Sequence, residues 1–333
     1  MEIFITGATG FIGLNLALKL ANSGHIVHAL CRSKEKAKSL NHPNIHIHMG
    51  DILNVESIEH AMHDCTHAFH LAAYAKIWSK DPNISYQVNV TGTNNVLNAC
   101  LKYNIKKVVV TSSAAIFGPS LNGELVREDT RREIGFFTEY ERTKLNSIEY
   151  IKEYGKKGLN IVVVYPTRVF GPGLLTQSNV VTSMIQWFVD RRINYVPGSR
   201  NKIGNYAYIK DVVRGHILAM ERGKAGDHYL LGGENLSYKQ IYKLLNKLMP
   251  KRFLLIGVPT EILYAVSYVF KILNKLIGTE PIVTHEWIKK YSYSWRCSNQ
   301  KAEEEIDYKV TPMEAGLYET ITWLSKESMS IKK

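Results

Sequence analysis

The sequence predicts an α/β protein, with a doubly wound parallel sheet followed by a smaller, mostly helical C-terminal lobe. Three observations predict this fold class. Short apolar runs alternate with segments of helical periodicity, a glycine-rich turn joins the first run to the first helix, and the alternation ends after Tyr165. Such alternation indicates parallel strands with helices on both faces, because every crossover returns over one face of the sheet.

Each apolar run has the length of a strand. The six expected strands are Ile3–Thr6, Ile26–Leu30, Ile45–Met49, Ala68–Leu71, Val108–Thr111 and Ile161–Tyr165. The helical segments between them are Ile12–Ala21, Val55–Met62, Ile84–Tyr103 and Glu139–Tyr154. Nearly continuous apolar strands are typical of a sheet that helices cover on both faces.

The second half of the chain follows a different pattern. Loops with Gly and Pro come after the sixth strand, and helical patterns dominate toward the C-terminus. A chain of 333 residues exceeds the size at which a single core stops growing. We therefore expect a first domain over residues 1–165, to which 205–232 return, and a second lobe from 166–204 and 233–333. The cleft between them is the expected ligand site.

The charge favours small anionic ligands. The formal net charge is +12, but Lys and Arg are spread along the chain with no run of five or six. No known nucleic-acid-binding module is present, so we expect ligands that carry phosphate and no nucleic acid. An apolar strand begins at Ile3, which leaves no room for a secretory signal, and no Cys-x-x-Cys pair occurs. These features predict free thiols in a cytoplasmic protein.

One long apolar stretch, Phe253–Ile277, is rich in Leu, Ile, Val and Tyr. Pro259, Glu261, Lys271 and Lys275 interrupt it, so it has no run of about 18–20 apolar residues that would cross a membrane. We expect an amphipathic or buried helix there, and no stable membrane insertion.

The glycine-rich turn carries the first functional signal. The first strand runs into Thr6-Gly7-Ala8-Thr9-Gly10-Phe11-Ile12-Gly13, and a helix follows. In such a strand–turn–helix unit, backbone N–H groups approach a pyrophosphate at the helix N-terminus. Gly7 permits the tight turn, Gly10 the close approach and Gly13 the contact between helix and sheet. The sequence therefore predicts a Rossmann-type dinucleotide site.

The tip of the second strand bears on which dinucleotide binds. An acidic residue there contacts the ribose hydroxyls and favours NAD. This chain has Arg32, with Lys36 nearby, and both side chains suit a 2′-phosphate. We expect NADP, with NAD as the alternative; the competing interpretation is that both cations are solvated surface charges. Asp51 is expected either to accept a hydrogen bond from the adenine amino group or to stabilise a turn.

An acid–base pair is expected on the helix that begins near Glu139. Tyr140 and Lys144 lie four residues apart and therefore share a helix face. A neighbouring ammonium lowers the pKa of a phenol, which makes Tyr140 a candidate general acid or base. Ser113 follows the fifth strand at the edge where open α/β sheets bind ligands, and its hydroxyl suits a carbonyl oxygen. Asn89 is expected to tie backbone groups or to relay a proton from Lys144.

Histidine is frequent, with seven residues between His42 and His70. His46 and His48 should face one side of a strand that helices cover, and no carboxylate or thiolate completes an evident tetrahedral set. We expect no metal site.

Together these residues resemble the extended short-chain dehydrogenase/reductase family of the NAD-dependent epimerase/dehydratase type, over nearly the whole chain. The glycine motif, the Tyr-x-x-x-Lys pair and the catalytic Ser are similar to marks of that family. Further similar segments are Gly50-Asp51, His70-Leu71-Ala72-Ala73, Asn89–Thr93, Ser113–Gly118 and Tyr165–Arg168. Within the family, Ala72–Pro82 and Tyr229–Asn235 look closest to dihydroflavonol-4-reductase-like reductases and hopanoid-associated epimerase-like proteins. Phe117 departs from many nucleotide-sugar epimerases, which have Tyr there.

The resemblance and the residues together imply a full set of site residues. The expected catalytic residues are Ser113, Tyr140 and Lys144. The expected cofactor contacts are Gly7, Thr9, Gly10, Phe11, Ile12, Gly13, Arg32, Lys36, Asp51, Ile52, Leu71, Ala72, Ala73, Thr111, Tyr140, Lys144, Tyr165, Pro166, Thr167 and Arg168. The expected substrate contacts are Tyr74, Ser113, Ala114 and Tyr140. The resemblance also implies a homodimer through the helices around 84–103 and 139–154.

Three functional hypotheses follow. The first is an NADP-dependent oxidoreductase that reduces an aldehyde or ketone on a lipophilic or polycyclic small molecule, with Tyr140 as general acid or base. Frequent aromatic residues in the second lobe favour that substrate class. The second is a nucleotide-sugar epimerase or dehydratase that transfers hydride transiently to bound NAD. The third is a dinucleotide-binding sensor without turnover.

Overall fold

The structure is a computed structural model of the chain, and it describes residues 1–76, 79, 81–175, 179–191, 193–249, 254–277 and 284–330. Its centre is a seven-stranded sheet in the order β10-β6-β5-β4-β1-β2-β3, and every neighbouring pair is parallel. The strands are β1 (Glu2–Thr6), β2 (Ile26–Cys31), β3 (Ile45–Met49), β4 (His67–His70), β5 (Lys107–Thr111), β6 (Ile161–Pro166) and β10 (His228–Leu231). The predicted doubly wound parallel sheet is confirmed.

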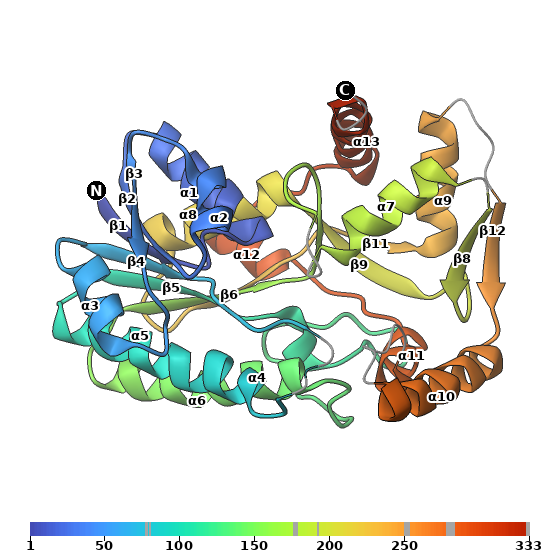
Figure 1. Cartoon of the computed structure of the whole chain (residues 1–333), viewed down its shortest axis with the longest axis horizontal. Coiled ribbons are helices and arrows are strands. Elements are labelled where there is room, and N and C mark those ends of the chain that lie inside the picture. Colours follow the sequence, from blue (N-terminus) through green and yellow to red (C-terminus); the bar gives the residue numbers. More distant parts are fainter. Residues whose placement is uncertain are drawn as a thin grey trace.

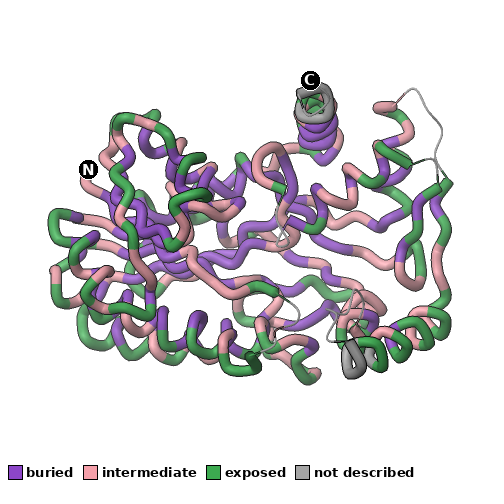
Figure 2. Tube along the Cα trace, in the orientation of Figure 1, coloured by how far each residue is buried: buried purple, intermediate pink, exposed green. Residues whose placement is uncertain are grey.

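Helices cover both faces of this sheet, as Figure 1 shows. One layer contains α1 (Phe11–Asn22), α8 (Ile209–Arg222) and α12 (Gln300–Ile306); the other contains α3 (Val55–Met62), α5 (Gly92–Lys102) and α6 (Glu139–Lys156). The short helix α2 (Lys34–Ala37) follows β2. Two buried clusters lie between the layers and the sheet (Figure 2), and adjacent residues such as Ile3 and Phe4 belong to opposite clusters. The alternation of side chains along a strand explains this division.

Outside the large sheet and its covering helices, the chain forms a region of small sheets and helices. Strands β11 (Glu234–Ser237), β9 (Ile203–Tyr208) and β7 (Arg168–Phe170) form one sheet, and β12 (Leu254–Val258) pairs in parallel with β8 (Ile193–Pro197). Its helices are α7 (Val180–Asp190), α9 (Tyr238–Leu248), α10 (Thr260–Ile277), α11 (His285–Tyr291) and α13 (Met313–Ser330). β10 returns the chain to the large sheet beside β6. The division into two domains at the expected boundaries stays a prediction.

One local expectation, the third strand, was wrong. β3 is the edge strand, and four of its five residues are exposed or only half-buried, so helices do not cover it as expected. His46 is therefore exposed, and His48 lies 3.0 Å from His28 across the strand pair. The expected helix Ile84–Tyr103 is confirmed, because α4 (Ile84–Tyr86), a π-helical turn (Gln87–Thr91) and α5 follow one another without a break.

Candidate active site

The glycine turn is shaped by close backbone contacts. Gly7 has a φ of +73°, a left-handed conformation that favours glycine, and its carbonyl oxygen accepts a hydrogen bond from the Gly10 N–H at 2.9 Å. A Cβ on Gly13 would lie 2.1 Å from the same Gly7 oxygen, and a Cβ on Gly7 would lie 2.7 Å from the Ala72 nitrogen. α1 begins directly after Gly10, which supplies no side-chain cap. The turn therefore fits a pyrophosphate that approaches free N–H groups at the start of α1.

Buried side chains hold the turn against the neighbouring strand. The Thr6 hydroxyl lies 2.7 Å from Nδ1 of His70, and Nε2 of His70 lies 2.9 Å from the Thr93 hydroxyl. The Thr6 hydroxyl also accepts a hydrogen bond from the Ala72 N–H. Burial, together with the Lys144 charge, lowers the pKa of His70 to about 3. A neutral imidazole therefore holds the Thr6 hydroxyl, which in turn binds the Ala72 N–H beside the turn.

Arg32 and Asp51 meet at the carboxyl ends of β2 and β3. The Arg32 guanidinium lies 3.8 Å from the Asp51 carboxylate, and the two side chains are 64% and 37% exposed. Asp51 also accepts a hydrogen bond from the Leu53 N–H at 2.9 Å, so it stabilises a turn while remaining accessible. Lys36 is exposed on α2, and Ile52 is buried next to Asp51. An anionic group on the ribose would meet Arg32 without displacing any buried contact.

The structure brings Ser113, Tyr140 and Lys144 together at the carboxyl end of β5. Thr138 caps α6 by accepting from the Glu141 N–H, which places Tyr140 in the first turn. The Tyr140 phenol hydrogen-bonds the Ser113 side chain. Lys144 lies one turn further along, is 2% exposed, and donates from Nζ to the Thr111 carbonyl oxygen at 2.8 Å. Ser113 also caps the short turn Ala114–Phe117 by accepting from the Ala115 N–H.

The expected effect of Lys144 on Tyr140 is not what the structure shows. Burial raises the pKa of Tyr140, the Ser113 hydrogen bond partly offsets this, and the Glu141 charge adds to the rise. Lys144 turns its ammonium to the Thr111 carbonyl, and burial lowers the pKa of Lys144 to about 8. The phenol of Tyr140 is therefore protonated at neutral pH, which is the form of a general acid.

Asn89 has a positioning role in the structure. Its amide accepts from the Tyr74 N–H at 2.7 Å and donates to the Tyr74 carbonyl at 3.1 Å and to the Thr143 hydroxyl at 2.9 Å. These contacts fix the irregular segment after β4 against α6. Of the two expected roles of Asn89, these contacts match the one in which its side chain ties backbone groups together.

The segment after β6 joins the two parts of the chain. Tyr165 is buried with its ring 4.9 Å from that of Phe117, and the Thr167 hydroxyl donates to Asn205 at 2.8 Å. The Arg168 guanidinium lies 5.7 Å from the Tyr206 ring of β9 and 5.2 Å from the Tyr291 ring of α11. Cofactor contacts from Tyr165, Pro166, Thr167 and Arg168 stay a prediction.

Sequence reasoning missed a buried ion-pair network beside Tyr140. Glu141 is fully buried; its carboxylate lies 2.7 Å from Arg132 and 2.9 Å from Lys290 of α11. The Phe137 N–H also donates to this carboxylate. An acidic residue in the first turn of a helix ordinarily signals favourable helix electrostatics at the surface. The only available signal was the apolar neighbourhood of Phe136-Phe137, which does not identify the distant partner on α11.

Other expectations concern absences. All four cysteines (Cys31, Cys65, Cys100 and Cys297) are free and buried. Within the described ranges, no group of three or more His, Cys, Asp or Glu side chains is placed to hold a metal ion. No helix among the described residues has the length and apolar character needed to cross a membrane.

The chain is similar in sequence and in fold to known enzymes. The model of the NAD dependent epimerase/dehydratase family matches residues 3–232. The chain is 29% identical over 329 residues to a putative dihydroflavonol 4-reductase of Synechocystis sp., with 96% of this chain and 93% of that protein covered. It is 25% identical over 331 residues to sterol demethylase protein B of Methylococcus capsulatus, with 99% of this chain and 100% of that protein covered. A UDP-glucose 4-epimerase structure from Thermotoga maritima, determined with UDP-glucose, has a TM-score of 0.81 at 21% identity, with 98% of this chain and 100% of that chain covered.

Proposed function

Because the chain belongs to the NAD dependent epimerase/dehydratase family, we propose that it is an NADP-dependent reductase of an aldehyde or ketone. The observation that carries the proposal is the Tyr140 phenol, protonated at neutral pH and hydrogen-bonded to Ser113 at the carboxyl end of β5. The reductase names of the Synechocystis relative and of cinnamoyl-CoA reductase 1 from Oryza sativa agree with this reaction class.

Arg32 supports NADP as the cofactor. It is the exposed cation at the tip of β2, where an acidic residue would favour NAD. Asp51 lies beside it but leaves most of the guanidinium accessible, so a 2′-phosphate has a charge-assisted partner. The close packing of the glycine turn supports a pyrophosphate site at the start of α1, because a Cβ on Gly7 or Gly13 would collide with the backbone of Ala72 or of Gly7.

The chain's own residues supply the proton chemistry. A bound nicotinamide would supply the hydride. Ser113 would orient the substrate carbonyl through its hydroxyl, and Tyr140 would donate its phenolic proton to the carbonyl oxygen as negative charge develops there. The buried Lys144 ammonium donates to the Thr111 carbonyl oxygen and would hold the end of β5, which Ser113 follows.

Two observations support a lipophilic substrate class. The aromatic residues Tyr206 and Tyr208 of β9 and Tyr238 and Tyr242 of α9 are buried, and one relative is named for sterol demethylation. A lipophilic or polycyclic carbonyl compound is therefore the proposed substrate, in a cytoplasmic homodimer that pairs through α5 and α6.

The test is the loss of reduced-nicotinamide absorbance with NADPH or NADH and a panel of aldehydes, ketones and 3-ketosteroids. Turnover with NADPH supports a reductase. The Tyr140→Phe variant should lose a factor on the order of 10² or more in kcat with NADPH affinity kept. Tyr154→Phe is the matched control on the same helix, because its hydroxyl meets Asn94.

Three results would count against the proposal. Near-normal turnover of Tyr140→Phe would remove the mechanism. NAD released on denaturation, without any net cofactor change, would favour the epimerase or dehydratase class. Tight NADPH binding with no turnover of any substrate would favour a sensor.

A further inference from the structure

α10 presents an apolar face to solvent. The exposed hydrophobic residues of this helix are Ile262, Val266, Tyr268, Val269, Ile272 and Leu273. Leu263, Tyr264, Ser267 and Phe270 occupy the other side and are buried or half-buried. A surface helix ordinarily turns its polar residues outward, because its apolar stripe packs on the core. The outward face of α10 is instead suited to contact with an apolar partner.

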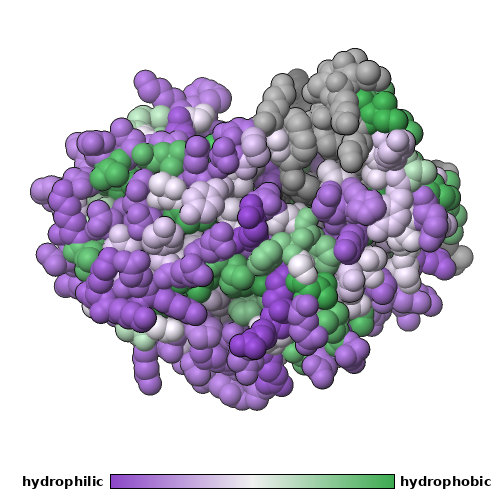
Figure 3. Space-filling view, turned by 90° about the horizontal axis from the view of Figure 1, so that it is seen from below, coloured by the Kyte–Doolittle hydropathy of each residue, from purple (hydrophilic) through white to green (hydrophobic). Residues whose placement is uncertain are grey.

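The strand pair before α10 extends the same character. In the β8–β12 register, Leu254 pairs with Ile193 and Ile256 pairs with Tyr195, so the four side chains share one face. All four are exposed, and Tyr195 is 63% exposed. We call these four residues and the six exposed residues of α10 the apolar surface. In Figure 3, hydrophobic side chains are exposed at the upper right edge of the molecule, among white and purple ones. Exposed apolar residues gathered on a helix face and on the strand pair that precedes it in the chain mark a candidate interaction site.

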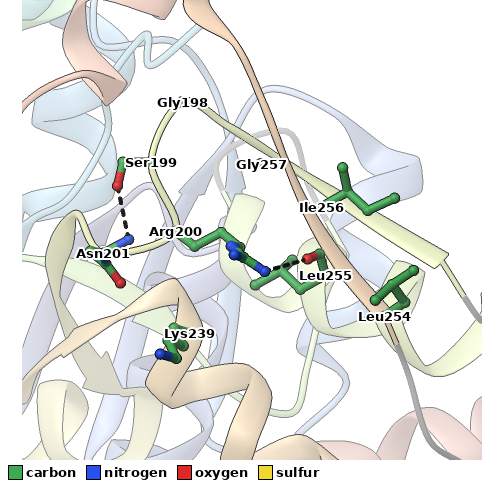
Figure 4. A pocket seen from close by; sticks show the side chains of 9 residues that line it. All are labelled: Gly198, Ser199, Arg200, Asn201, Lys239, Leu254, Leu255, Ile256 and Gly257. Atoms are coloured by element: carbon green, nitrogen blue, oxygen red, sulfur yellow. Dashed lines mark hydrogen bonds between the residues drawn. The ribbon is translucent and has the colours of Figure 1, made fainter.

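A cationic pocket adjoins the apolar surface (Figure 4). Its volume is about 540 Å³, and it is lined by Gly198, Ser199, Arg200, Asn201, Lys239, Leu254, Leu255, Ile256 and Gly257. Arg200 donates to the Leu255 carbonyl oxygen at 3.1 Å, which holds the guanidinium against β12. In the part of the chain that the structure describes, neither Arg200 nor Lys239 forms an ion pair with a carboxylate. The pocket thus offers two cations to an anionic group, next to exposed Leu254 and Ile256.

The sequence of this region has the matching charge. Residues 239–275 contain seven Lys or Arg residues and a single acidic residue, Glu261. A basic segment with an outward apolar helix face is the pattern of an interfacial helix, in which apolar side chains enter the lipid and cations meet anionic headgroups. A second copy of the chain would bring the same positive charge to the contact, which disfavours self-association through this face.

We propose that the apolar surface and the Arg200–Lys239 pocket bind the face of a bilayer that contains anionic phospholipid. α10 lies in the plane of the interface with its exposed residues among the acyl chains, and phosphate headgroups meet Arg200 and Lys239. The binding is peripheral, in accord with the absence of a membrane-crossing helix among the described residues. It needs neither cofactor nor substrate, so it stands or falls independently of the reductase proposal.

The experiment is sedimentation of the full chain with vesicles in about 0.1 M salt. One vesicle population is phosphatidylcholine alone, and the other contains about 30% phosphatidylglycerol. The wild-type protein should partition at least about tenfold more strongly onto the anionic vesicles, and about 0.5 M salt should weaken this preference.

Matched variants locate the contact. Tyr268→Asp on α10 and Tyr318→Asp on α13 alter tyrosines that are 65% and 62% exposed, and only the first should weaken partitioning, by about tenfold. Lys239→Glu should weaken binding to anionic vesicles, whereas Lys152→Glu on α6, an exposed control, should not. Unchanged thermal unfolding of the four variants shows that each is folded.

Three outcomes overturn the proposal. The first is the absence of wild-type partitioning onto anionic vesicles. The second is equal weakening by Tyr318→Asp and Tyr268→Asp. The third is a wild-type dimer that Tyr268→Asp converts to monomer in light scattering without an effect on sedimentation, which would assign the apolar surface to a second copy.

Discussion

The Lys144 ammonium donates to the Thr111 carbonyl oxygen at 2.8 Å, beneath the site that Ser113 and Tyr140 form. Lys144 is 2% exposed, and burial lowers its pKa to about 8. The position therefore trades folding stability for a charge placed behind the reacting groups, as strained or desolvated active-site residues commonly do.

Replacing Lys144 tests whether this residue lowers the stability of the fold while it supports turnover. Lys144→Met should abolish most turnover yet raise the free energy of unfolding at pH 7 by about 1–2 kcal/mol. Removing the buried ammonium relieves a desolvation cost of about 3 kcal/mol, which corresponds to its lowered pKa. Losing the hydrogen bond to Thr111 destabilises the variant by about 1 kcal/mol, so the net gain is smaller. Because the folded-state pKa is lowered, the cost is fully present below about pH 8 and fades as pH rises toward the unfolded value of 10.5. Urea unfolding at pH 7 and pH 10 measures this, and a less stable variant at pH 7 would contradict it.

The sequence alone predicted the strands of the large sheet and the positions of the candidate site residues along the chain. Periodicity located the six predicted strands and gave Val55–Met62 with the observed bounds of α3. The glycine spacing, the Tyr140–Lys144 spacing and the position of Ser113 after β5 are local features, so local reasoning identified residues that the structure brings together. The family resemblance is confirmed by the match over residues 3–232.

What the sequence did not reveal depends on contacts between distant segments. The prediction that helices cover the third strand was wrong, because β3 lies at the edge of the sheet. The order of the strands depends on the whole sheet and not on the local sequence. The predicted direction of the Tyr140 pKa shift was wrong because burial of the phenol raises its pKa. The Lys144 ammonium donates to a carbonyl oxygen of β5. Glu141 was missed because its partner Lys290 comes from a helix near the C-terminus.

The glycine turn yields a steric prediction. Gly13→Ala should weaken NADPH binding at least about tenfold and destabilise the fold by about 1–3 kcal/mol, because the new Cβ would lie 2.1 Å from the Gly7 carbonyl oxygen. Gly155→Ala is the matched control in α6, where a Cβ meets nothing within 4 Å. It should stabilise the helix by about 0.5–1 kcal/mol. Fluorescence titration with NADPH and thermal unfolding distinguish the two, and equal behaviour would argue against the proposed turn geometry.

Arg32 yields a prediction about cofactor preference. Arg32→Ala should raise KM for NADPH by about 10–100-fold and leave KM for NADH within about threefold, since a charge-assisted contact contributes about 1.5–3 kcal/mol. Lys106→Ala, at an exposed position before β5, controls for the loss of one positive charge. Equal effects on both cofactors would remove Arg32 from the 2′-phosphate site.

His70 predicts an acid-dependent loss of stability. Burial, with the Lys144 charge, lowers its pKa to about 3 from an ordinary 6.5, so the unfolded chain binds a proton that the folded chain does not between these values. Stability should fall by about 1.4 kcal/mol per pH unit below about pH 6.5 from this group alone. His216, whose pKa burial lowers to about 4, acts in the same direction. Urea midpoints at pH 7.5, 6.0 and 5.0 should show a shallower slope for His70→Gln than for the wild type; parallel slopes would exclude His70 as a source.

The buried Glu141 carboxylate predicts a link between the catalytic helix and α11. Glu141→Gln leaves the Arg132 and Lys290 charges without their partner in a buried place, so the free energy of unfolding should fall by about 3–5 kcal/mol. Glu139→Gln removes the exposed pair with Arg142 on the same helix and should cost less than about 1 kcal/mol. Because the Glu141 charge also raises the pKa of Tyr140, the variant's alkaline limit of kcat should move to lower pH, which a loss of stability alone would not cause. An unshifted pH profile in folded Glu141→Gln, measured below its unfolding temperature, would confine Glu141 to a structural role.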